Sequence, residues 1–413
     1  MADLGFGTYR VSINNPKHIE ALKEAIQSGI RLIDTSTNYM NGDSQRAVGH
    51  VLKTVAPELL NEIEIVSKVG YIQGETLERH FESSFDEVVE YSPNCFHSIS
   101  QSFIKDQITI SLQRMELDYI DCLLLHNPEY FILDGINRGI EKDDRLDGMY
   151  QRIYDAFLAL EEEVSGGRIK SYGISSNSFS KHPNDEEFLP YEDLLTLAQD
   201  AANELRNKKH SFTTIQLPIN FLEKDGLQCA AWAKSKGLRV LVNRPLNAQK
   251  EMKMFRLADY EEPREYYYYL NELLDLTENK MLKPLNTLVE ELDESRHRFG
   301  WIGEYDIFMF SQVVPKIREF ITPLDDENRA VIVDIIDMFI QEYGKMVAYE
   351  CSKKTREHLK EEFAEYIGSL QSCSLKFLLN NKNIDYVLIG ARKPSYVVDA
   401  VSIKLEQLKE KES

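Results

Sequence analysis

Short apolar runs alternate with longer amphipathic stretches along most of the chain. Eight runs rich in strand-forming residues occur at 4–9, 30–34, 63–68, 119–126, 169–175, 214–217, 239–243 and 386–389. Between the first two, the stretch 16–26 places its apolar residues on one face of a helix, and Gly29 follows it as a helix-ending residue. Strands that alternate with helices indicate parallel βα units. Eight such units close most simply into an α/β fold of the (β/α)8 TIM barrel type, which is the fold that we predict.

One region is too long for the loop and helix that a barrel needs between its seventh and eighth strands. It covers residues 249–372 and holds 16 Lys and Arg against 26 Asp and Glu, an imbalance that is half of the net charge of -20. Apolar spacing predicts helices over 268–276, 330–340 and 359–370 within it. We therefore predict a large acidic helical insertion over the mouth or side of the barrel. The expected domains are 1–248 for barrel strands one to seven, 249–372 for the insertion, and 373–413 for the eighth strand and the last helix.

The insertion contains four consecutive tyrosines, Tyr266 to Tyr269. They are interpreted either as amphipathic residues at the edge of helical packing or as a binding platform, and the first interpretation is favoured.

Composition excludes several classes of function. A net charge of -20 and a pI near 5.0 disfavour binding to nucleic acid or to an anionic membrane, because both attract basic surfaces. The five cysteines are scattered and lack CxxC spacing, so neither a disulfide framework nor a metal site is expected. No secretory signal pattern and no membrane-spanning apolar run is present, and we expect a soluble, cytoplasmic protein.

Polar side chains stand at the ends of neighbouring predicted strands, where barrel enzymes carry their catalytic groups. Asp34 ends the second run, Lys68 the third and His126 the fourth, while Tyr39 follows Asp34 by five residues. Three of them have an ordinary explanation alone: Asp34 as a helix cap, Tyr39 as one of 21 tyrosines and His126 as a buried histidine. Lys68 is less ordinary, because an ammonium that ends an apolar strand needs an anionic partner. Together the four residues favour a catalytic site.

These four side chains suit the reduction of a carbonyl group. Hydride addition leaves negative charge on the oxygen, and a phenol with a pKa of about 10 is a poor proton donor unless a cation lowers that pKa. We expect Lys68 to lower the pKa of Tyr39, Asp34 to hold the Lys68 ammonium, and neutral His126 to donate a hydrogen bond to the substrate oxygen. A lyase that uses Lys68 as a Schiff-base nucleophile is an alternative, but a neighbouring Asp34 would keep the lysine charged.

The chain resembles the aldo-keto reductase superfamily. The resemblance is carried, in the family's order, by Gly5 to Arg10, Arg31 to Tyr39 with Gly42 to Gly49, Val66 to Lys68, Asp118 to His126 and Gly167 to Asn177. It covers about residues 4–248 and 374–405. It implies a catalytic tetrad of Asp34, Tyr39, Lys68 and His126, and an extended NADPH, with NADH as the alternative, bound without a Rossmann domain. In agreement, no Gly-x-Gly-x-x-Gly turn follows the first predicted strand.

The resemblance also implies cofactor-binding positions. Ser176, Asn177 and Gln216 would contact the nicotinamide carboxamide. The other implied positions are Gly7, Thr8, Arg244, Leu246, Gly390, Arg392 and Lys393. The two cations near Gly390 favour the extra phosphate of NADPH.

Three positions depart from the family pattern. Asn243 stands where an aromatic residue usually stacks on the nicotinamide, and Tyr396 and Ala400 stand where an Arg and an Asn often hold the adenosine end. The predicted activity is hydride transfer between NAD(P)H and an aldehyde, ketone or sugar-type carbonyl, with a small carbonyl or alcohol as substrate. The alternative is a non-catalytic cofactor-binding barrel with a regulatory or scaffold role. Substrate specificity is expected to come from residues 127–148 and the insertion, while the substrate itself, the direction of reaction and the oligomeric state do not follow from these residues.

Overall fold

The computed structural model describes residues 1–278, 280–324 and 326–412 of the chain. It divides into two compact units. The first comprises Met1–Pro245 with Leu375–Ser413, and the second comprises Leu246–Ser374.

The first unit is built on a closed parallel barrel. Its strands follow the order β1-β13-β10-β9-β8-β7-β3-β2 around the barrel. Their bounds are β1 Asp3–Gly7, β2 Leu32–Asp34, β3 Glu64–Val69, β7 Ile120–His126, β8 Ile169–Ser175, β9 Phe212–Pro218, β10 Arg239–Asn243 and β13 Tyr386–Ile389. Each overlaps one of the eight apolar runs, so the predicted (β/α)8 barrel is confirmed.

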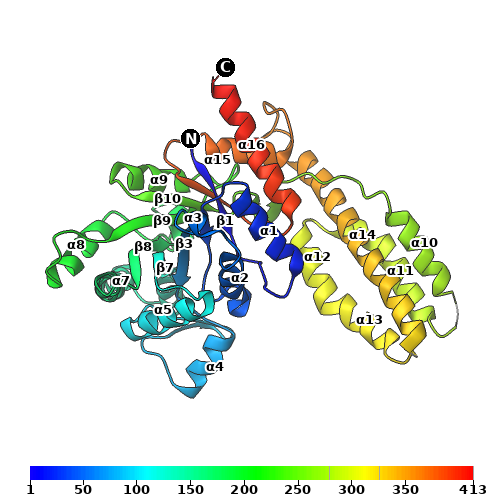
Figure 1. The fold of residues 1–413 in the computed structure, drawn as a ribbon, viewed down its shortest axis with the longest axis horizontal. Coiled ribbons are helices and arrows are strands. Elements are labelled where there is room, and N and C mark those ends of the chain that lie inside the picture. The colour runs from blue at the N-terminus through cyan, green and yellow to red at the C-terminus, as the bar shows by residue number, and fades with distance from the viewer. Residues whose placement is uncertain (279, 325, 413) are drawn as a thin grey trace. The chain divides into compact units, whose positions relative to one another are not determined.

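Helices surround this barrel (Figure 1). The main ones are α1 Pro16–Gln27, α2 Asp43–Leu52, α5 Gln101–Met115, α7 Lys142–Ser165, α8 Leu194–Glu204, α9 Gly226–Ser235, α15 Leu370–Leu379 and α16 Pro394–Glu412, with short helices α3 Pro57–Leu60 and α6 Tyr130–Asn137 between them. Helix α1 confirms the predicted amphipathic helix. Asn15 caps it by accepting a hydrogen bond from the Lys17 amide, and Pro16 occupies its first turn.

Side chains along each strand point alternately into and out of the barrel, and the inward-pointing ones fill its interior. A buried apolar cluster contains Leu32, Val66, Cys122, Leu124, Leu241 and Leu388, which come from five different strands. Successive side chains on a strand point to opposite faces, so the residue two positions after an inward-facing one also points inward, one layer further along. Bulky side chains need space in this layer, and Gly5 supplies it, since a Cβ there would lie 2.7 Å from Leu388 Cδ2.

A small subdomain that the sequence analysis did not identify follows β3. It consists of β4 Tyr71–Ile72, α4 Glu75–Glu82, β5 Val89–Ser92 and β6 Cys95–His97. The strands pair antiparallel in the order β4-β6-β5. Ile72, Phe96 and Phe103 form its buried core, so the sheet is anchored on α5 of the barrel unit.

The second unit is mainly helical. A hairpin of β11 Asn247–Lys250 and β12 Lys253–Arg256 opens it. The helices are α10 Tyr266–Leu276, α11 Lys283–Ser295, α12 Ile302–Phe308, α13 Val314–Ile321 and α14 Asp326–His358. Figure 1 shows α10, α11, α13 and α14 packed as a bundle, with α14 in contact with α10. The unit has its own core, to which α10, α11, α12 and α14 all contribute.

The four tyrosines of α10 divide between the core and the surface. Tyr266 is fully buried and donates a hydrogen bond to Asp293 Oδ1 at 2.6 Å, whereas Tyr267 and Tyr268 are exposed. Tyr269 is partly buried against the core. This arrangement agrees with packing at a helix edge.

The predicted helix over 359–370 is wrong. Helix α14 ends at His358, and the chain then forms turns until α15 begins at Leu370. Leu359 and Phe363 are still buried, which explains their apolar spacing. Gly368 has a φ of 125° and its carbonyl accepts a hydrogen bond from Arg356, so the chain folds back where a helix would have continued.

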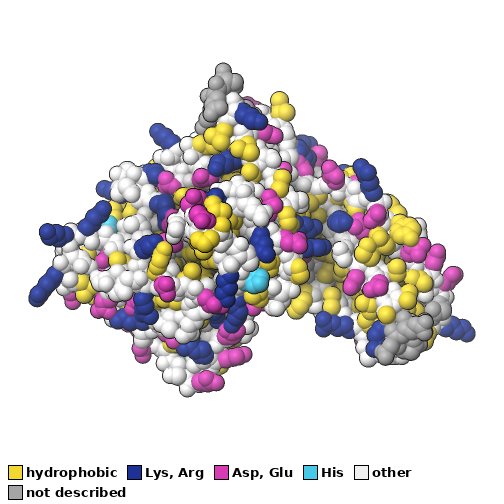
Figure 2. All heavy atoms as spheres, in the orientation of Figure 1, with side chains coloured by type: hydrophobic (Ala, Val, Ile, Leu, Met, Phe, Trp, Pro, Cys, Tyr) yellow, Lys and Arg dark blue, Asp and Glu magenta, His cyan; other side chains and the backbone are white. Residues whose placement is uncertain are grey.

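The surface carries both signs of charge. On the face shown in Figure 2, lysine and arginine side chains lie among the aspartates and glutamates and interrupt the acidic regions. Among the described residues, no helix is long and apolar enough to cross a membrane.

Candidate active site

The carboxyl ends of the barrel strands carry the candidate residues. Asp34 comes two positions after Leu32, Lys68 after Val66, and His126 after Leu124, and each earlier residue belongs to the barrel's inner cluster. The alternation of β-strands therefore turns all three polar side chains into the barrel. Strands β2, β3 and β7 are neighbours in the sheet, which brings the three residues together.

Lys68 is the centre of a buried network. Its side chain is fully buried, and its Nζ donates hydrogen bonds to Asp34 Oδ2 at 2.6 Å and to the Thr35 carbonyl at 3.0 Å. The third donor reaches Tyr39 Oη at 3.1 Å. The other oxygen of Asp34 accepts a hydrogen bond from Gln216 Nε2 at 2.7 Å, so both oxygens of the carboxylate have partners. This arrangement leaves Lys68 with no freedom to reorient.

The expected effect of Lys68 on Tyr39 is wrong for the protein as it stands. The pKa of Tyr39 is raised well above 10, first by burial and then by Asp34 and Tyr9. Burial also lowers the pKa of Lys68, against the opposing effect of Asp34. The carboxylate offsets the charge of the ammonium, so the phenol does not feel an isolated cation. Tyr39 is therefore protonated near neutral pH, and it can release this proton to a substrate only where Lys68, 3.1 Å from its oxygen, stabilises the phenolate that forms.

His126 lies against this network as a neutral imidazole. Burial lowers its pKa well below 6.5, and Lys68 and His97 lower it further. Its ring meets Tyr39 edge to face with centroids 5.8 Å apart. His97 Nε2 lies 2.7 Å from the His126 carbonyl oxygen and fixes the backbone at the end of β7. His126 is therefore held beside the Tyr39 phenol in an uncharged form.

A chain of hydrogen bonds indicates which nitrogen of His126 carries the proton. Asn38 Nδ2 donates to Gln73 Oε1 at 3.1 Å, which leaves Asn38 Oδ1 to accept from Ser36 Oγ at 2.7 Å. The Ser36 hydroxyl has only one proton, so at 3.2 Å its oxygen accepts from His126 Nδ1. With these amide orientations the proton lies on Nδ1, and Nε2 is an acceptor.

Aromatic side chains surround the two catalytic candidates. Tyr9 contacts Tyr39 edge to face at 5.2 Å, and Tyr71 of the small sheet contacts His126 in the same manner at 4.8 Å. Asn127, in a left-handed conformation with a φ of 52°, donates to Tyr71 Oη at 2.6 Å. Tyr71 in turn donates to Tyr130 Oη at 3.3 Å. Tyr71 cannot be recognised as a site residue from the sequence, because its place beside His126 depends on a sheet far from β7 in the sequence.

The loop after β8 contains Ser176 and Asn177, and a buried carboxylate holds it. Ser176 Oγ donates to Glu129 Oε2 at 2.9 Å, and the Asn177 amide donates to Glu129 Oε1 at 2.9 Å. The Ser178 amide is also within 3.3 Å of that oxygen. Asn177 Nδ2 reaches Asn127 Oδ1 at 3.3 Å. Sequence reasoning missed Glu129, although an acidic residue directly after a strand-end His-Asn-Pro is a signal that could have been examined.

Gln216 and Asn243 form the adjoining wall. Gln216 Oε1 accepts hydrogen bonds from Ser175 Oγ at 3.0 Å and from Asn243 Nδ2 at 3.4 Å. Asn243 Oδ1 is buried and has no hydrogen-bond partner among the described residues. An unpaired buried carbonyl oxygen is costly, so an external N–H donor would be stabilising there. The amide of a nicotinamide fits that requirement.

The residues predicted to hold the phosphates follow β13, which pairs with β1, and the predicted cofactor residue Thr8 follows β1. The Thr8 amide and hydroxyl both donate to the Asp34 carbonyl, at 2.9 and 3.0 Å, so Thr8 fixes the end of β2. A Cβ on Gly390 would meet no atom within 4 Å, which leaves its backbone open to a ligand. Arg392 and Lys393 are exposed just before α16. These features suit a phosphate group.

Three further residues were predicted to bind the cofactor, and the structure shows no feature that ties them to a particular part of it. Arg244 has a φ of 53°, its Nε is buried without a partner among the described residues, and its Nη2 is 3.7 Å from Glu223 Oε1. Leu246 begins the helical unit. Gly7 ends β1.

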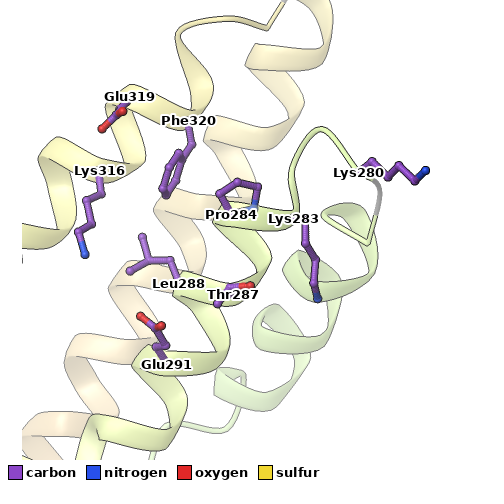
Figure 3. Close-up of a pocket in the computed structure, with 9 residues that line it drawn as sticks. All are labelled: Lys280, Lys283, Pro284, Thr287, Leu288, Glu291, Lys316, Glu319 and Phe320. Carbon is purple, nitrogen blue, oxygen red and sulfur yellow. The ribbon is translucent and has the colours of Figure 1, made fainter.

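No metal cluster competes with this site among the described residues, and the cavity in the helical unit lacks its chemistry. No group of three or more His, Cys, Asp and Glu side chains there is placed to hold a metal ion. A cavity of about 610 Å³ lies within the helical unit, between α11 and α13. Figure 3 shows Phe320, Pro284 and Leu288 grouped at its wall, while Lys280 extends away from them. It contains no paired acid and base comparable to Tyr39 and Lys68.

Parts of the chain are similar in sequence to known oxidoreductases. An uncharacterized oxidoreductase of Bacillus subtilis is 27% identical over 176 residues, which cover 43% of this chain and 45% of that protein. The NADH-specific methylglyoxal reductase of Escherichia coli is 28% identical over 134 residues, covering 30% of this chain and 38% of the relative. The matched segments thus span less than half of each relative's length.

Solved structures resemble the chain over a greater length. An aldo-keto reductase from Bacillus halodurans has 17% identity and a TM-score of 0.47, covering 97% of this chain and 86% of its own. A glycerol dehydrogenase from Gluconobacter oxydans has 14% identity and a TM-score of 0.49, and the match covers 98% of this chain and 89% of that chain. The model of the aldo/keto reductase family matches residues 3–413. The chain therefore belongs to the aldo/keto reductase family.

Proposed function

We propose that the chain is a reductase that transfers a hydride between NAD(P)H and a small aldehyde, ketone or sugar-type carbonyl compound. The observation that carries this proposal is the position of Lys68 Nζ, which hydrogen-bonds both Asp34 Oδ2 and Tyr39 Oη inside the barrel. A protein that only bound a cofactor would need neither the acid nor the buried ion pair. Relatives include a D-threo-aldose 1-dehydrogenase of Pseudomonas and an NAD(P)H-dependent D-xylose reductase of Candida tenuis.

In the proposed reaction Tyr39 donates the proton to the carbonyl oxygen. A bound NAD(P)H would supply the hydride that the carbonyl carbon accepts. Lys68 donates a hydrogen bond to Tyr39 Oη and stabilises the phenolate that remains after proton transfer. Asp34, held by Gln216, keeps the ammonium in place. His126 lies edge to face against Tyr39 and would form the wall of the substrate site beside the phenol. With its proton on Nδ1, its Nε2 would accept a hydrogen bond from an alcohol.

The cofactor site is assigned to residues at the strand ends. Ser176, Asn177, Gln216 and the unpaired Asn243 oxygen would hold the carboxamide. Gly390, Arg392 and Lys393 would hold the phosphates. Gly7, Thr8 and Arg244 would complete the site within the barrel unit. The two cations favour NADPH, and NADH is the alternative.

A Schiff-base lyase is disfavoured by the environment of Lys68. Its side chain is completely buried and all three donors are used by Asp34, Thr35 and Tyr39. A substrate carbonyl would have to displace these partners before it could react with the amine.

The direct test is a panel of aldehydes, ketones and sugars assayed for oxidation of NADPH and of NADH by the purified chain. We expect turnover with at least one carbonyl class and tighter binding of NADPH, measured by fluorescence titration. Cofactor binding without turnover of any carbonyl would support the regulatory or scaffold alternative. Equal affinity for the two cofactors would contradict the role of Arg392 and Lys393.

A further inference from the structure

Glu129 is a buried carboxylate beside the proposed nicotinamide site. It is 3% exposed and lies directly before α6, three residues after His126. Its oxygens accept hydrogen bonds from Ser176 Oγ and from the backbone amides of Asn177 and Ser178. It thus holds, without an intermediate residue, the loop that we assign to the carboxamide.

The groups that face Glu129 are polar but uncharged. The loop after β8 presents a hydroxyl and two amides, while Tyr71 of β4 and Tyr130 of α6 are the titratable neighbours. No Lys, Arg or His among the described residues forms an ion pair with Glu129. Burial raises its pKa to about 7 in spite of the three hydrogen bonds. A buried charge without a counter-ion is costly, and a cation bound nearby would offset that cost.

The nicotinamide ring is a candidate for this cation, because it carries a positive charge when oxidised and none when reduced. We propose that ionised Glu129 sets the redox preference of the cofactor site by favouring the oxidised nicotinamide over the reduced one. The proposal rests on the proposed function, since it requires the nicotinamide to lie at the loop 176–178. The hydrogen bonds alone do not require an acid, because the oxygen of a glutamine can accept from the same amides. The negative charge is what Glu129 adds.

Because the pKa of Glu129 and the binding of the cofactor are coupled, the proposal predicts that protons are released on binding. If the oxidised ring stabilises the carboxylate, binding of oxidised cofactor lowers the pKa of Glu129 and releases a proton near pH 7. Binding of reduced cofactor releases none from this group. Calorimetric titration at pH 7 in two buffers with different heats of ionisation counts the protons directly and does not depend on turnover.

The main test measures dissociation constants of oxidised and reduced cofactor by fluorescence titration, for the wild type and for Glu129→Gln, at pH 6 and pH 8. We expect the preference for oxidised cofactor to rise from pH 6 to pH 8 in the wild type. In Glu129→Gln that preference should fall at pH 8 by on the order of tenfold, and its pH dependence should disappear.

Glu161→Gln is the matched control. Glu161 is fully buried and accepts hydrogen bonds from Tyr172 and Ser211, but it lies at the opposite, amino-terminal end of β9. Its replacement should leave the ratio of the two constants unchanged. If Glu129→Gln lost affinity equally for oxidised and reduced cofactor, or if the ratio of the two dissociation constants at pH 8 stayed unchanged, the charge of Glu129 would have no role. Failure of the wild type to bind either form would refute the proposed function itself.

Discussion

Lys68 Nζ lies 2.6 Å from Asp34 Oδ2, and the side chains of both residues are buried in the barrel. Removing one charge of such a pair leaves the other without compensation, which typically costs about 3–5 kcal/mol. We expect Lys68→Met and Asp34→Asn each to lower the free energy of unfolding by about that amount in urea denaturation.

A double variant distinguishes the stabilisation that comes from the ion pair from the stabilisation that each side chain contributes by packing. Lys68→Met combined with Asp34→Asn removes both charges, so its loss of stability should be smaller than the sum of the two single losses. Strict additivity of the three measurements would show that the two side chains do not stabilise each other.

Tyr39 is the proposed proton donor, and its hydroxyl is the only part removed in Tyr39→Phe. We expect carbonyl reduction to fall by about 10²- to 10⁴-fold, the usual contribution of a general acid. The dissociation constant of the cofactor should stay within about twofold. Steady-state kinetics and fluorescence titration make the two measurements.

Tyr9→Phe is a matched control for this substitution. The Tyr9 ring packs edge to face on Tyr39 and is 61% exposed, but its hydroxyl contacts none of the tetrad in the hydrogen bonds of the structure. Activity near the wild-type level is expected for Tyr9→Phe. If Tyr39→Phe were equally active, another group would have to supply the proton.

The hydrogen bonds of Ser36 predict which tautomer of His126 the free protein contains. Ser36 Oγ donates to Asn38 Oδ1 and so accepts from His126 Nδ1, which places the imidazole proton on Nδ1. Nitrogen-15 NMR distinguishes the two tautomers by chemical shift. We expect the Nδ1–H form in the free wild type and a mixed population in Ser36→Ala, because the alanine offers no acceptor to Nδ1.

This tautomer also affects what His126 can do. An Nε2 without a proton accepts a hydrogen bond from an alcohol but cannot donate one to a carbonyl oxygen. An Nε2–H spectrum in the free wild type would contradict the hydrogen-bond assignment and restore the simpler role predicted from the sequence.

The barrel and its catalytic candidates could be predicted because the signal is local. Leu32 and Asp34, Val66 and Lys68, and Leu124 and His126 are each two positions apart, so a strand places each polar residue in the same interior as its apolar partner. The same short sequence thus predicts both that a strand is present and that the polar residue at its end points into the barrel.

The features that escaped prediction depend on contacts between distant segments. The pKa of Tyr39 is set by burial and by Asp34, whose effects follow from the folded environment and not from the neighbouring residues in sequence. Residues 359–370 have helical apolar spacing, yet Gly368 and the Arg356 contact end the helix. Tyr71 and Glu129 acquire their positions from the small sheet and the β8 loop.

Glu129 also predicts a dependence of stability on pH. Its pKa is about 7 in the folded chain, against 4.5 for an exposed glutamate. Between these values the folded state binds the proton and the unfolded state does not, so the contribution is fully present below the lower value and is lost as pH rises through the upper one. The loss should reach about 3 kcal/mol. Urea denaturation from pH 4.5 to 8 should therefore show that wild type loses stability relative to Glu129→Gln over this range. A difference that stays constant with pH would mean that the carboxyl group titrates alike in both states.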